Sequence, residues 1–349
     1  MKINFTKHLK TAGALFLFFI LAYVSMSGLA YVGYACIRKV KPSTIYIPTG
    51  STLEQQAALL VEYGSIKDTT EFLNYVRKFR HEDFKPGKYV LDKKISYSRL
   101  LKLLAEGRQT PVRLTFTPSR TIGDVSAKIA RNIECDSMTI DSLLHNNSMA
   151  RRYGFDSLTF TVMLVPNTYE VYWNISVDEL FEKLHKEYDI FWSKNNREAL
   201  LAQMGMTKQE VVTLASIVYE ESKIESDMRK IAGVYINRLR IGMRLQADPT
   251  CKYAVGDWTI KRVMKGHTAV NSPYNTYLVA GLPPGPIVIP SIAAIDAVLN
   301  YDKSKNIYFC ASPDFDGTHL FSPTLDAHNK IVRAFRKAYQ ARQETLTNQ

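Results

Sequence analysis

The amino-acid sequence predicts an α+β protein with a single N-terminal membrane-spanning helix. The first observation is that no charged residue occurs from Thr11 to Ile37, a stretch longer than the roughly 20 residues that span a bilayer. The second is that a β-rich run, a polar turn and an amphipathic helix follow one another three times after this stretch. The third is that the remaining chain combines long helical patterns with a hairpin near its end.

The uncharged stretch has the properties of a signal anchor. It exceeds the core of a signal peptide, which is about 7 to 15 residues long, so we expect the segment to stay attached. Cys36 raises the alternative of a lipoprotein cleavage site, but the preceding residues GYA match such a site poorly. Three lysines precede the stretch and three basic residues follow it closely. Charge alone therefore does not decide which side of the membrane the rest of the chain faces.

The three strand-turn-helix patterns lie at residues 45–62, 88–107 and 113–132. Each begins with a β-rich run, continues through a polar turn that contains Ser or Thr, and ends in an amphipathic helix. Their spacing is irregular, which argues against a solenoid. The sequence therefore predicts a small α+β module, which either binds a polymer or holds the next domain away from the membrane.

The C-terminal part is predicted to be mainly helical, and its loops carry most of the candidate functional residues. Residues 136–200 are predicted to be helical, with an irregular segment at 160–176. A hairpin turn is expected at Asp316-Gly317, and a basic helix is expected from about Leu325. The loops are MRLQADPT (243–250), NSPYNTY (271–277) and GLPPGPI (281–287).

Composition excludes some classes of function. The formal net charge of +12 is compatible with an anionic partner or with a basic surface that only aids solubility, and the absence of an aromatic RNA-binding motif argues against nucleic acid. Cys36, Cys135, Cys251 and Cys310 show no metal-ligand spacing. We expect no metal and no cofactor, and either a Cys251–Cys310 disulfide or isolated buried thiols.

Two adjacent glutamates stand in the stretch LASIVYEES, at positions 214–222. Thr207 and Glu210 form a capping-box pattern, so the helix is expected to begin at Thr207. At 3.6 residues per turn, Glu221 continues the apolar stripe that starts at Leu214, whereas Glu220 falls on a polar stripe and is expected to be solvated. Burial would raise the pKa of Glu221, as a general acid requires, although a structural ion pair with Arg238 or Arg244 is the alternative.

The segments LASIVYEES, VYINRLRIGMRLQADPT, YNTYLVAGLPPGPI and AHNK together resemble the endolytic murein transglycosylase family, the MltG or YceG-like proteins. The resemblance covers nearly the whole chain, and its motifs are most specific over residues 214–290. It implies a cytoplasmic tail (1–10), the membrane anchor (11–37), a LysM-like α+β region (40–135) and a mixed α/β catalytic domain (136–349). The N-terminus would lie inside and the catalytic domain outside the cytoplasmic membrane.

The resemblance also implies an activity. Family members cut glycan strands of peptidoglycan between N-acetylmuramic acid and N-acetylglucosamine and leave a 1,6-anhydromuramoyl end. Cell-wall synthases would be further partners. The catalytic acid of the family, the second of a Glu-x-Glu pair, falls on Glu221, whereas the first position is occupied by Tyr219. This departure leaves open which group adjusts the pKa of the catalytic carboxyl group.

Other polar residues are candidates for substrate binding, each with a structural alternative. Packing or capping would equally explain most of them, and Tyr277 would also suit a core position. The candidates are Asn237, Arg238, Gln246, Asp248, Asn275, Thr276, Tyr277 and Asn329. His328 lies beside Asn329 at the start of the last helix, and Asn167, Thr168 and Tyr169 resemble a second family element in which Asn replaces Asp.

Two other functions stay open from the sequence. The chain could be a membrane-anchored scaffold that binds peptidoglycan without cleaving it, or a hydrolytic muramidase that uses Asp248 as a second carboxylate.

Overall fold

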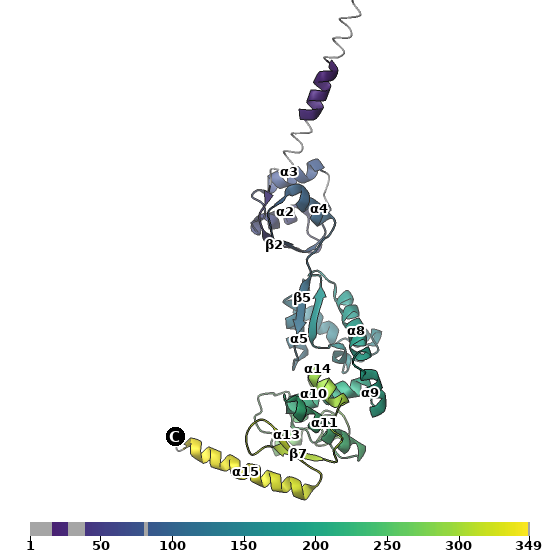
Figure 1. Cartoon of the computed structure of the whole chain (residues 1–349), viewed down its shortest axis with the longest axis vertical. Coiled ribbons are helices and arrows are strands. Elements are labelled where there is room, and N and C mark those ends of the chain that lie inside the picture. Colours follow the sequence, from purple (N-terminus) through teal and green to yellow (C-terminus); the bar gives the residue numbers. More distant parts are fainter. Residues whose placement is uncertain (1–15, 27–38, 80–82, 348–349) are drawn as a thin grey trace, which may run out of the picture. The chain divides into compact units, whose positions relative to one another are not determined.

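The computed structural model describes residues 16–26, 39–79 and 83–347, and these form two compact units (Figure 1). Unit 1 comprises Met1–Val112 and Glu170–Asn174, and unit 2 comprises Arg113–Tyr169 and Ile175–Gln349. The sequence predicts a domain border after Cys135, whereas this division lies between Val112 and Arg113. Residues 113–135 pack with unit 2 because helix α5 (Ile122–Ala130) lies against helix α6 (Ser137–Leu144).

The predicted membrane anchor falls largely outside the described residues. Residues 16–26 are helical, and the rest of the uncharged stretch and the whole of the predicted cytoplasmic tail are not described. Within the part of the chain that is described, no helix combines the length and the apolarity that a bilayer crossing requires. The anchor stays a prediction.

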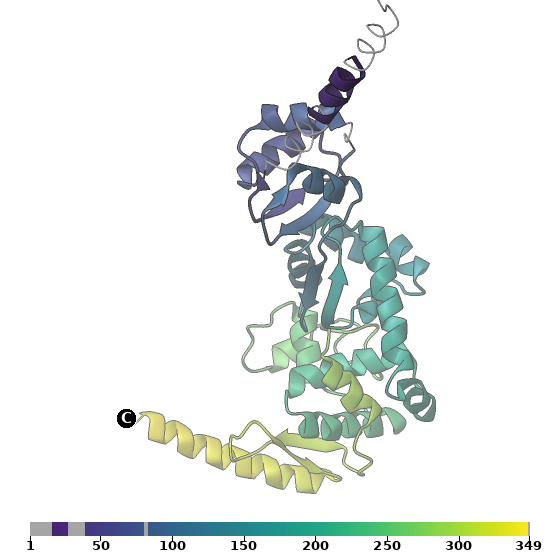
Figure 2. The same cartoon turned by 45° about the horizontal axis from the view of Figure 1, so that its top comes forward.

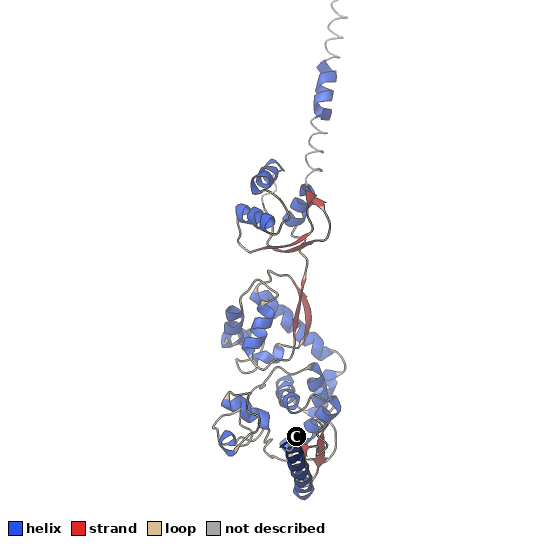
Figure 3. Ribbon diagram, turned by 90° about the vertical axis from the view of Figure 1, so that its left-hand side faces the viewer, coloured by secondary structure: helices blue, strands red, loops and turns tan. Residues whose placement is uncertain are grey.

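Unit 1 is a small α+β unit in which helices pack on two short antiparallel sheets (Figure 3). Strand β2 pairs with β3 from Ser43↔Leu91 to Ile47↔Gly87, and β1 pairs with β4. The elements are β1 (Lys39–Val40), β2 (Ser43–Ile47), α2 (Leu53–Glu62), α3 (Thr69–Phe79), β3 (Gly87–Leu91), β4 (Ile95–Ser96) and α4 (Tyr97–Ala105). The first two predicted strand-turn-helix patterns are thereby confirmed.

Local sequence signals fix the elements of unit 1. Thr52 and Gln55 form a capping box at the start of α2, and Ser96 caps α4. Gly87 has φ of 140°, and a Cβ atom there would lie 2.2 Å from the side chain of Gln109. Only glycine therefore fits where β3 begins. The core beneath the helices is apolar and includes Ile45 and Tyr89.

Unit 2 is mainly helical, with two two-stranded sheets (Figure 2). Helix α10 packs against α11 and α14 and forms the centre of the unit. The remaining elements are β5 (Val112–Phe116), α7 (Asn147–Arg152), the 3-10 turn η1 (Phe160–Met163), β6 (Asn167–Val171), α8 (Val177–Ser193), α9 (Arg197–Met204), α10 (Lys208–Glu221), α11 (Glu225–Arg240), α12 (Asp248–Val255), α13 (Lys265–Thr268), α14 (Ile292–Leu299), β7 (Tyr308–Ala311), β8 (His319–Ser322) and α15 (Leu325–Thr347).

The segment 160–176, which the sequence predicts to be irregular, contains the turn η1 and the strand β6. Strand β6 pairs with β5, and the hydroxyl groups of Thr115 and Thr168 lie 2.7 Å apart between the two strands. The prediction was wrong for β6 because its partner lies about fifty residues earlier in the chain, beyond the reach of a local pattern. The third strand-turn-helix pattern is confirmed as β5 and α5, both largely in unit 2.

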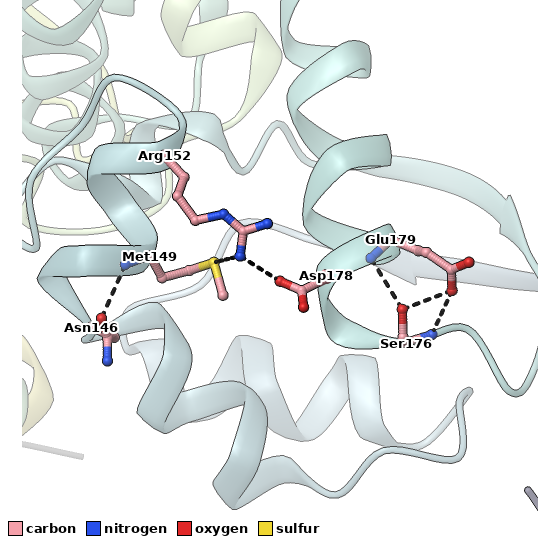
Figure 4. A network of polar contacts seen from close by, with 6 residues as sticks. All are labelled: Asn146, Met149, Arg152, Ser176, Asp178 and Glu179. Atoms are coloured by element: carbon pink, nitrogen blue, oxygen red, sulfur yellow. Dashed lines mark hydrogen bonds and ion pairs between the residues drawn. The ribbon is translucent and has the colours of Figure 1, made fainter.

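Helices α7 and α8 are fixed at their N-termini by polar side chains (Figure 4). Asn146 accepts a hydrogen bond from the backbone of Met149, and Ser176 and Glu179 form a capping box. Arg152 donates a hydrogen bond of 2.7 Å to Asp178 and so connects the two helices. This ion pair is exposed, so solvent screens it and we expect it to contribute little to stability.

The predicted hairpin and basic helix are confirmed. Strands β7 and β8 pair from Tyr308↔Ser322 to Ala311↔His319, and Gly317 in the connecting turn has φ of 83°. Helix α15 begins at Leu325 and packs along both strands.

Candidate active site

Helix α10 carries the two adjacent glutamates and is fixed by a capping box at its start and by burial along its middle. Thr207 and Glu210 form the predicted capping box at its start, and every residue from Val211 to Val218 is buried. The hydroxyl group of Ser216 accepts a hydrogen bond of 3.0 Å from the backbone of Ile287. The helix ends at Glu221 because Ser222 adopts an extended conformation, so Glu221 is presented at the last helical position.

Glu220 is not solvated, and the prediction from helical periodicity was wrong on this point. Its side chain is only 8% exposed and accepts a hydrogen bond of 2.9 Å from Arg120, while Lys223 lies 3.5 Å away. Arg120 comes from a loop 100 residues earlier, which a helical wheel cannot show. Glu220 is therefore a paired structural carboxylate.

Glu221 has the electrostatic character of an acid that keeps its proton near neutral pH. Burial raises the pKa of its carboxyl group to about 7, and the negative charge of Asp248 acts in the same direction. The hydroxyl group of Tyr235 donates a hydrogen bond of 2.8 Å to Glu221 Oε1, which favours the carboxylate and partly offsets burial. The predicted rise of this pKa is confirmed in direction and cause.

Glu221 borders a cavity of about 310 Å³, which we call the Glu221 pocket. Its walls come from α10, α11, the loop before α12 and the start of that helix, the loop that carries Tyr277, strand β7 and the start of α15. The lining residues are Glu221, Tyr235, Arg238, Leu245, Gln246, Asp248, Tyr277, Phe309 and His328. Of the eight candidates for substrate binding, Arg238, Gln246, Asp248 and Tyr277 are thus brought together around Glu221.

Asp248 and Tyr277 are hydrogen-bonded to each other at the wall of this pocket. The hydroxyl group of Tyr277 donates a hydrogen bond of 2.6 Å to Asp248 Oδ1, and burial with this bond raises the pKa of Tyr277 well above its usual range. Gln246 has φ of 50°, a left-handed conformation that is uncommon for residues other than glycine. Its backbone N–H donates to the carbonyl of Thr276 at 3.1 Å, which holds this conformation.

Arg238 lines the pocket but uses its guanidinium group to hold the backbone. It is 8% exposed and donates to the carbonyls of Ile307 at 2.7 Å and of Leu245 at 2.8 Å, with a longer bond to Arg244. Burial lowers the pKa of this group from its ordinary value. The neighbouring Asn237 likewise donates to two carbonyls, those of Ser304 and Asn306. Both side chains fasten the chain that precedes β7 to α11.

Three further candidates lie away from the pocket. Asn275 is fully buried and donates to the carbonyls of Thr268 and Val270, while Thr276 is 1% exposed and accepts from the backbone of Ala247. These two side chains set the position of the loop that carries Tyr277. Asn329 is exposed on α15 and does not line the pocket. Packing therefore describes Asn275 and Thr276, whereas Asn329 lies exposed on α15.

Sequence reasoning missed Tyr235, Leu245 and Phe309 as lining residues, whereas His328, named beside Asn329 from the sequence, does line the pocket. Tyr235 stands one helical turn before Arg238, so the shared face of α11 was the signal that would have found it. His328 stacks on Tyr308 at 5.2 Å, and its Nδ1 atom has no hydrogen-bond partner among the described residues. It is therefore a lining residue with an unused polar atom.

A buried carboxylate–histidine pair supports the pocket from behind. Asp227, which is 3% exposed, accepts a hydrogen bond of 2.6 Å from Nδ1 of His319 on β8. The ring of His319 meets Phe309 edge-on at 5.3 Å, and Phe309 meets Tyr235 in the same way at 5.7 Å. The pair therefore ties β8 to α11 and places the aromatic wall beside Glu221.

Cys251 and Cys310 are both free, so of the two alternatives the isolated thiols describe this structure. Burial raises the pKa of Cys251 to about 11, and this thiol donates to Asn275 Oδ1 at 3.3 Å.

Comparison with known proteins identifies similar sequences and one similar solved structure. An endolytic murein transglycosylase of Bacillus subtilis is 28% identical over 308 aligned positions, which cover 83% of this chain and 84% of the relative. One of Streptococcus pneumoniae is also 28% identical, over 93% of this chain but only 65% of its own length. The crystal structure of a YceG-like protein of Listeria monocytogenes is 27% identical, with a TM-score of 0.54, and the match covers 84% of this chain and 99% of that chain.

A family model also matches most of this chain. The model that describes the YceG-like family matches residues 45–334, which include most of both units and every residue of the Glu221 pocket. The chain therefore belongs to the YceG-like family.

Proposed function

We propose that this protein is an endolytic lytic transglycosylase that cleaves peptidoglycan glycan strands between N-acetylmuramic acid and N-acetylglucosamine. The observation that carries the proposal is Glu221, a carboxyl group with a pKa of about 7 at the end of a buried helix beside a polar and aromatic cavity. The relatives from Bacillus subtilis and Streptococcus pneumoniae, which are named endolytic murein transglycosylases, support the same activity.

The mechanism needs only one carboxyl group. Glu221 donates its proton to the glycosidic oxygen while the bond to the anomeric carbon of the muramoyl residue breaks through an oxocarbenium-like state. The resulting carboxylate then removes the proton from the muramoyl 6-hydroxyl, whose oxygen bonds to the same anomeric carbon. Glu221 regains its proton, and no water is consumed. Because the nucleophile is part of the substrate, orientation in the pocket replaces a water-activating base.

The side chains around Glu221 have supporting roles in this proposal. Tyr235 holds one carboxylate oxygen, so the other oxygen is available for proton transfer. Tyr219 occupies the position of the first acid of the family pair, and Tyr235 donates a hydrogen bond to Glu221 from the neighbouring helix. Gln246, Asp248 and Tyr277 offer an amide, a carboxylate and a hydroxyl group to sugar hydroxyls.

Product analysis separates this activity from its competitors. Purified full-length protein is incubated with peptidoglycan, and the glycan ends are identified by mass spectrometry. Anhydromuramoyl ends are the expected result. Reducing ends would instead indicate a muramidase in which Asp248 is the second carboxylate, and unaltered strands would favour the non-catalytic scaffold.

The pH dependence of cleavage tests the state of Glu221. Because the acid must carry its proton, kcat/KM should be constant well below pH 7 and fall about tenfold per pH unit above the pKa of about 7. Tyr235→Phe removes a hydrogen bond that favours the carboxylate, so it should raise this pKa and move the falling limb to higher pH. A limb that stays in place, or moves to lower pH, would contradict the assigned role of Tyr235.

We also propose that the chain is anchored in the cytoplasmic membrane, with its N-terminus inside and the LysM-like unit 1 and unit 2 outside. The uncharged stretch from Thr11 to Ile37 supports this location, which would bring the pocket to newly made strands and to cell-wall synthases. Protease added to intact, wall-free cells should digest both units. Digestion that requires membrane permeabilisation would exclude this orientation.

A further inference from the structure

A second cavity of unit 2, of about 440 Å³, lies outside the Glu221 pocket and takes no part in the mechanism above. Its walls are the loop at 119–123, the end of α12 with the following turn, Tyr274, and the segment 286–289. Leu158 and Thr161 line it as well. We call it the Trp258 pocket after its largest side chain. Its volume is in the range of ligand-binding sites.

The backbone around the Trp258 pocket is fixed independently of any ligand. Ser119 and Ile289 exchange two backbone hydrogen bonds, of 2.8 and 3.3 Å, and so join two walls. A Cβ atom at Gly285 would lie 2.3 Å from the carbonyl oxygen of Leu158, so only glycine allows the GLPPGPI loop to approach this closely. The cavity is therefore a built feature of the fold.

Three aromatic rings form one side of this pocket. The rings of Tyr253 and Tyr274 lie 4.6 Å apart, and Trp258 meets Tyr253 edge-on at 6.4 Å. The guanidinium group of Arg120 lies over the indole ring of Trp258, 5.1 Å from its centroid, and holds the ring in place. Rings with polar tips beside hydroxyl groups, here those of Thr121 and Ser157, suit the alternating apolar and hydroxylated surfaces of a sugar.

The charges around the pocket favour a neutral ligand. Arg120 and His145 are the ionisable basic side chains that line it. Arg120 is already paired with Glu220 at 2.9 Å, and His145 lies 3.3 Å from Asp141. An anionic ligand such as a stem-peptide carboxylate would have to compete with Glu220 for Arg120. An uncharged sugar would not.

Two connections join the Trp258 pocket to the catalytic acid. Helix α12 carries Asp248 into the Glu221 pocket and Tyr253 into the Trp258 pocket, five residues or about 7.5 Å along the helix axis. Arg120 in turn binds Glu220, the neighbour of Glu221. The two cavities are therefore close enough for one extended strand to enter both.

We propose that the Trp258 pocket binds an uncharged N-acetylhexosamine unit of the glycan strand, at a distance from the bond that is cleaved. The inference rests on the proposed function and deepens it. An enzyme that cuts within strands requires chain on both sides of the broken bond. A remote sugar site beside Trp258 supplies binding free energy that only a long strand can use.

The test compares glycan strands of graded length, with and without stem peptides, on full-length protein. Trp258→Ala should raise KM for long strands about tenfold and leave kcat unchanged, because it removes uniform binding. Oligosaccharides too short to reach the pocket should be cleaved as by wild type. Trp258→Phe should restore most of the binding. Tyr339→Ala, which removes an exposed ring on α15, is the matched control and should change nothing.

Three outcomes would overturn the sugar site. They are an unchanged KM of Trp258→Ala for long strands, an equal loss on short and long strands, and a loss confined to strands that carry stem peptides. The last would assign the pocket to the peptide.

A binding measurement separates failure of this inference from failure of the proposed function. Stem-free strands are titrated into Glu221→Gln protein with and without Trp258→Ala, whether or not the wild type cleaves. Weaker binding with Trp258→Ala would support the sugar site even if no anhydromuramoyl product is ever formed. Equal binding would overturn it.

Discussion

Glu221→Gln is expected to lower the rate of strand cleavage by about 10²- to 10⁴-fold, the contribution typical of a general acid. Glutamine has nearly the same shape and keeps an oxygen that accepts the hydrogen bond from Tyr235, but it has no proton to transfer at neutral pH. The measurement is the rate at which anhydromuramoyl ends form at about pH 6.5, below the pKa of Glu221, by mass spectrometry.

The matched control is Glu220→Gln, the same change one residue earlier. Its carboxylate pairs with Arg120 and Lys223 outside the Glu221 pocket, so cleavage should stay within a few-fold of wild type. An inactive Glu220→Gln protein with an active Glu221→Gln protein would reverse the assignment. Loss of activity in Asp248→Asn, together with reducing ends from the wild type, would point to the two-carboxylate alternative.

Stability should change in the opposite direction from activity in Glu221→Gln. The folded-state pKa of Glu221 is raised above the ordinary 4.5 to about 7. A raised carboxyl pKa means that stability present at low pH is lost as pH rises from the unfolded value through the folded one. Glutamine does not ionise, so the variant should have a higher Tm than wild type at pH 8 and a similar Tm at pH 4. A lower Tm at pH 8 would contradict the burial of this carboxyl group.

Arg238→Ala is expected to lower the free energy of unfolding by about 3 kcal/mol, since hydrogen bonds from a charged donor are lost and buried carbonyls are left without one. Leu245 lines the Glu221 pocket, and Ile307 stands two residues before the lining residue Phe309, so activity should fall as well. Urea unfolding measures the first effect, and cleavage kinetics measure the second.

Arg240→Ala is the matched control because Arg240 stands on the same helix but is exposed. It should change the free energy of unfolding by less than about 0.5 kcal/mol. Arg238→Ala could instead leave the free energy of unfolding unchanged and raise only KM. In that case the prediction that Arg238 binds substrate would be correct, and its assigned structural role would be wrong.

The sequence by itself determined the features that depend on near neighbours along the chain. Capping at Thr207 fixed the register of α10, and periodicity placed Glu221 on the apolar stripe. The three strand-turn-helix patterns and the turn at Gly317 were determined in the same way. Interactions within about four residues govern caps, turns and helical faces, so such features can be read without knowledge of the rest of the molecule.

Only the tertiary structure decided which partners each polar group has. Arg120 reaches Glu220 across 100 residues, and Arg238 reaches Ile307 across 69. Neither separation leaves a local pattern, which is why Glu220 was expected in solvent and Arg238 in contact with substrate. The pKa of Glu221 likewise depends on burial and on Tyr235, because the energy of a charge is set by whatever surrounds it in space.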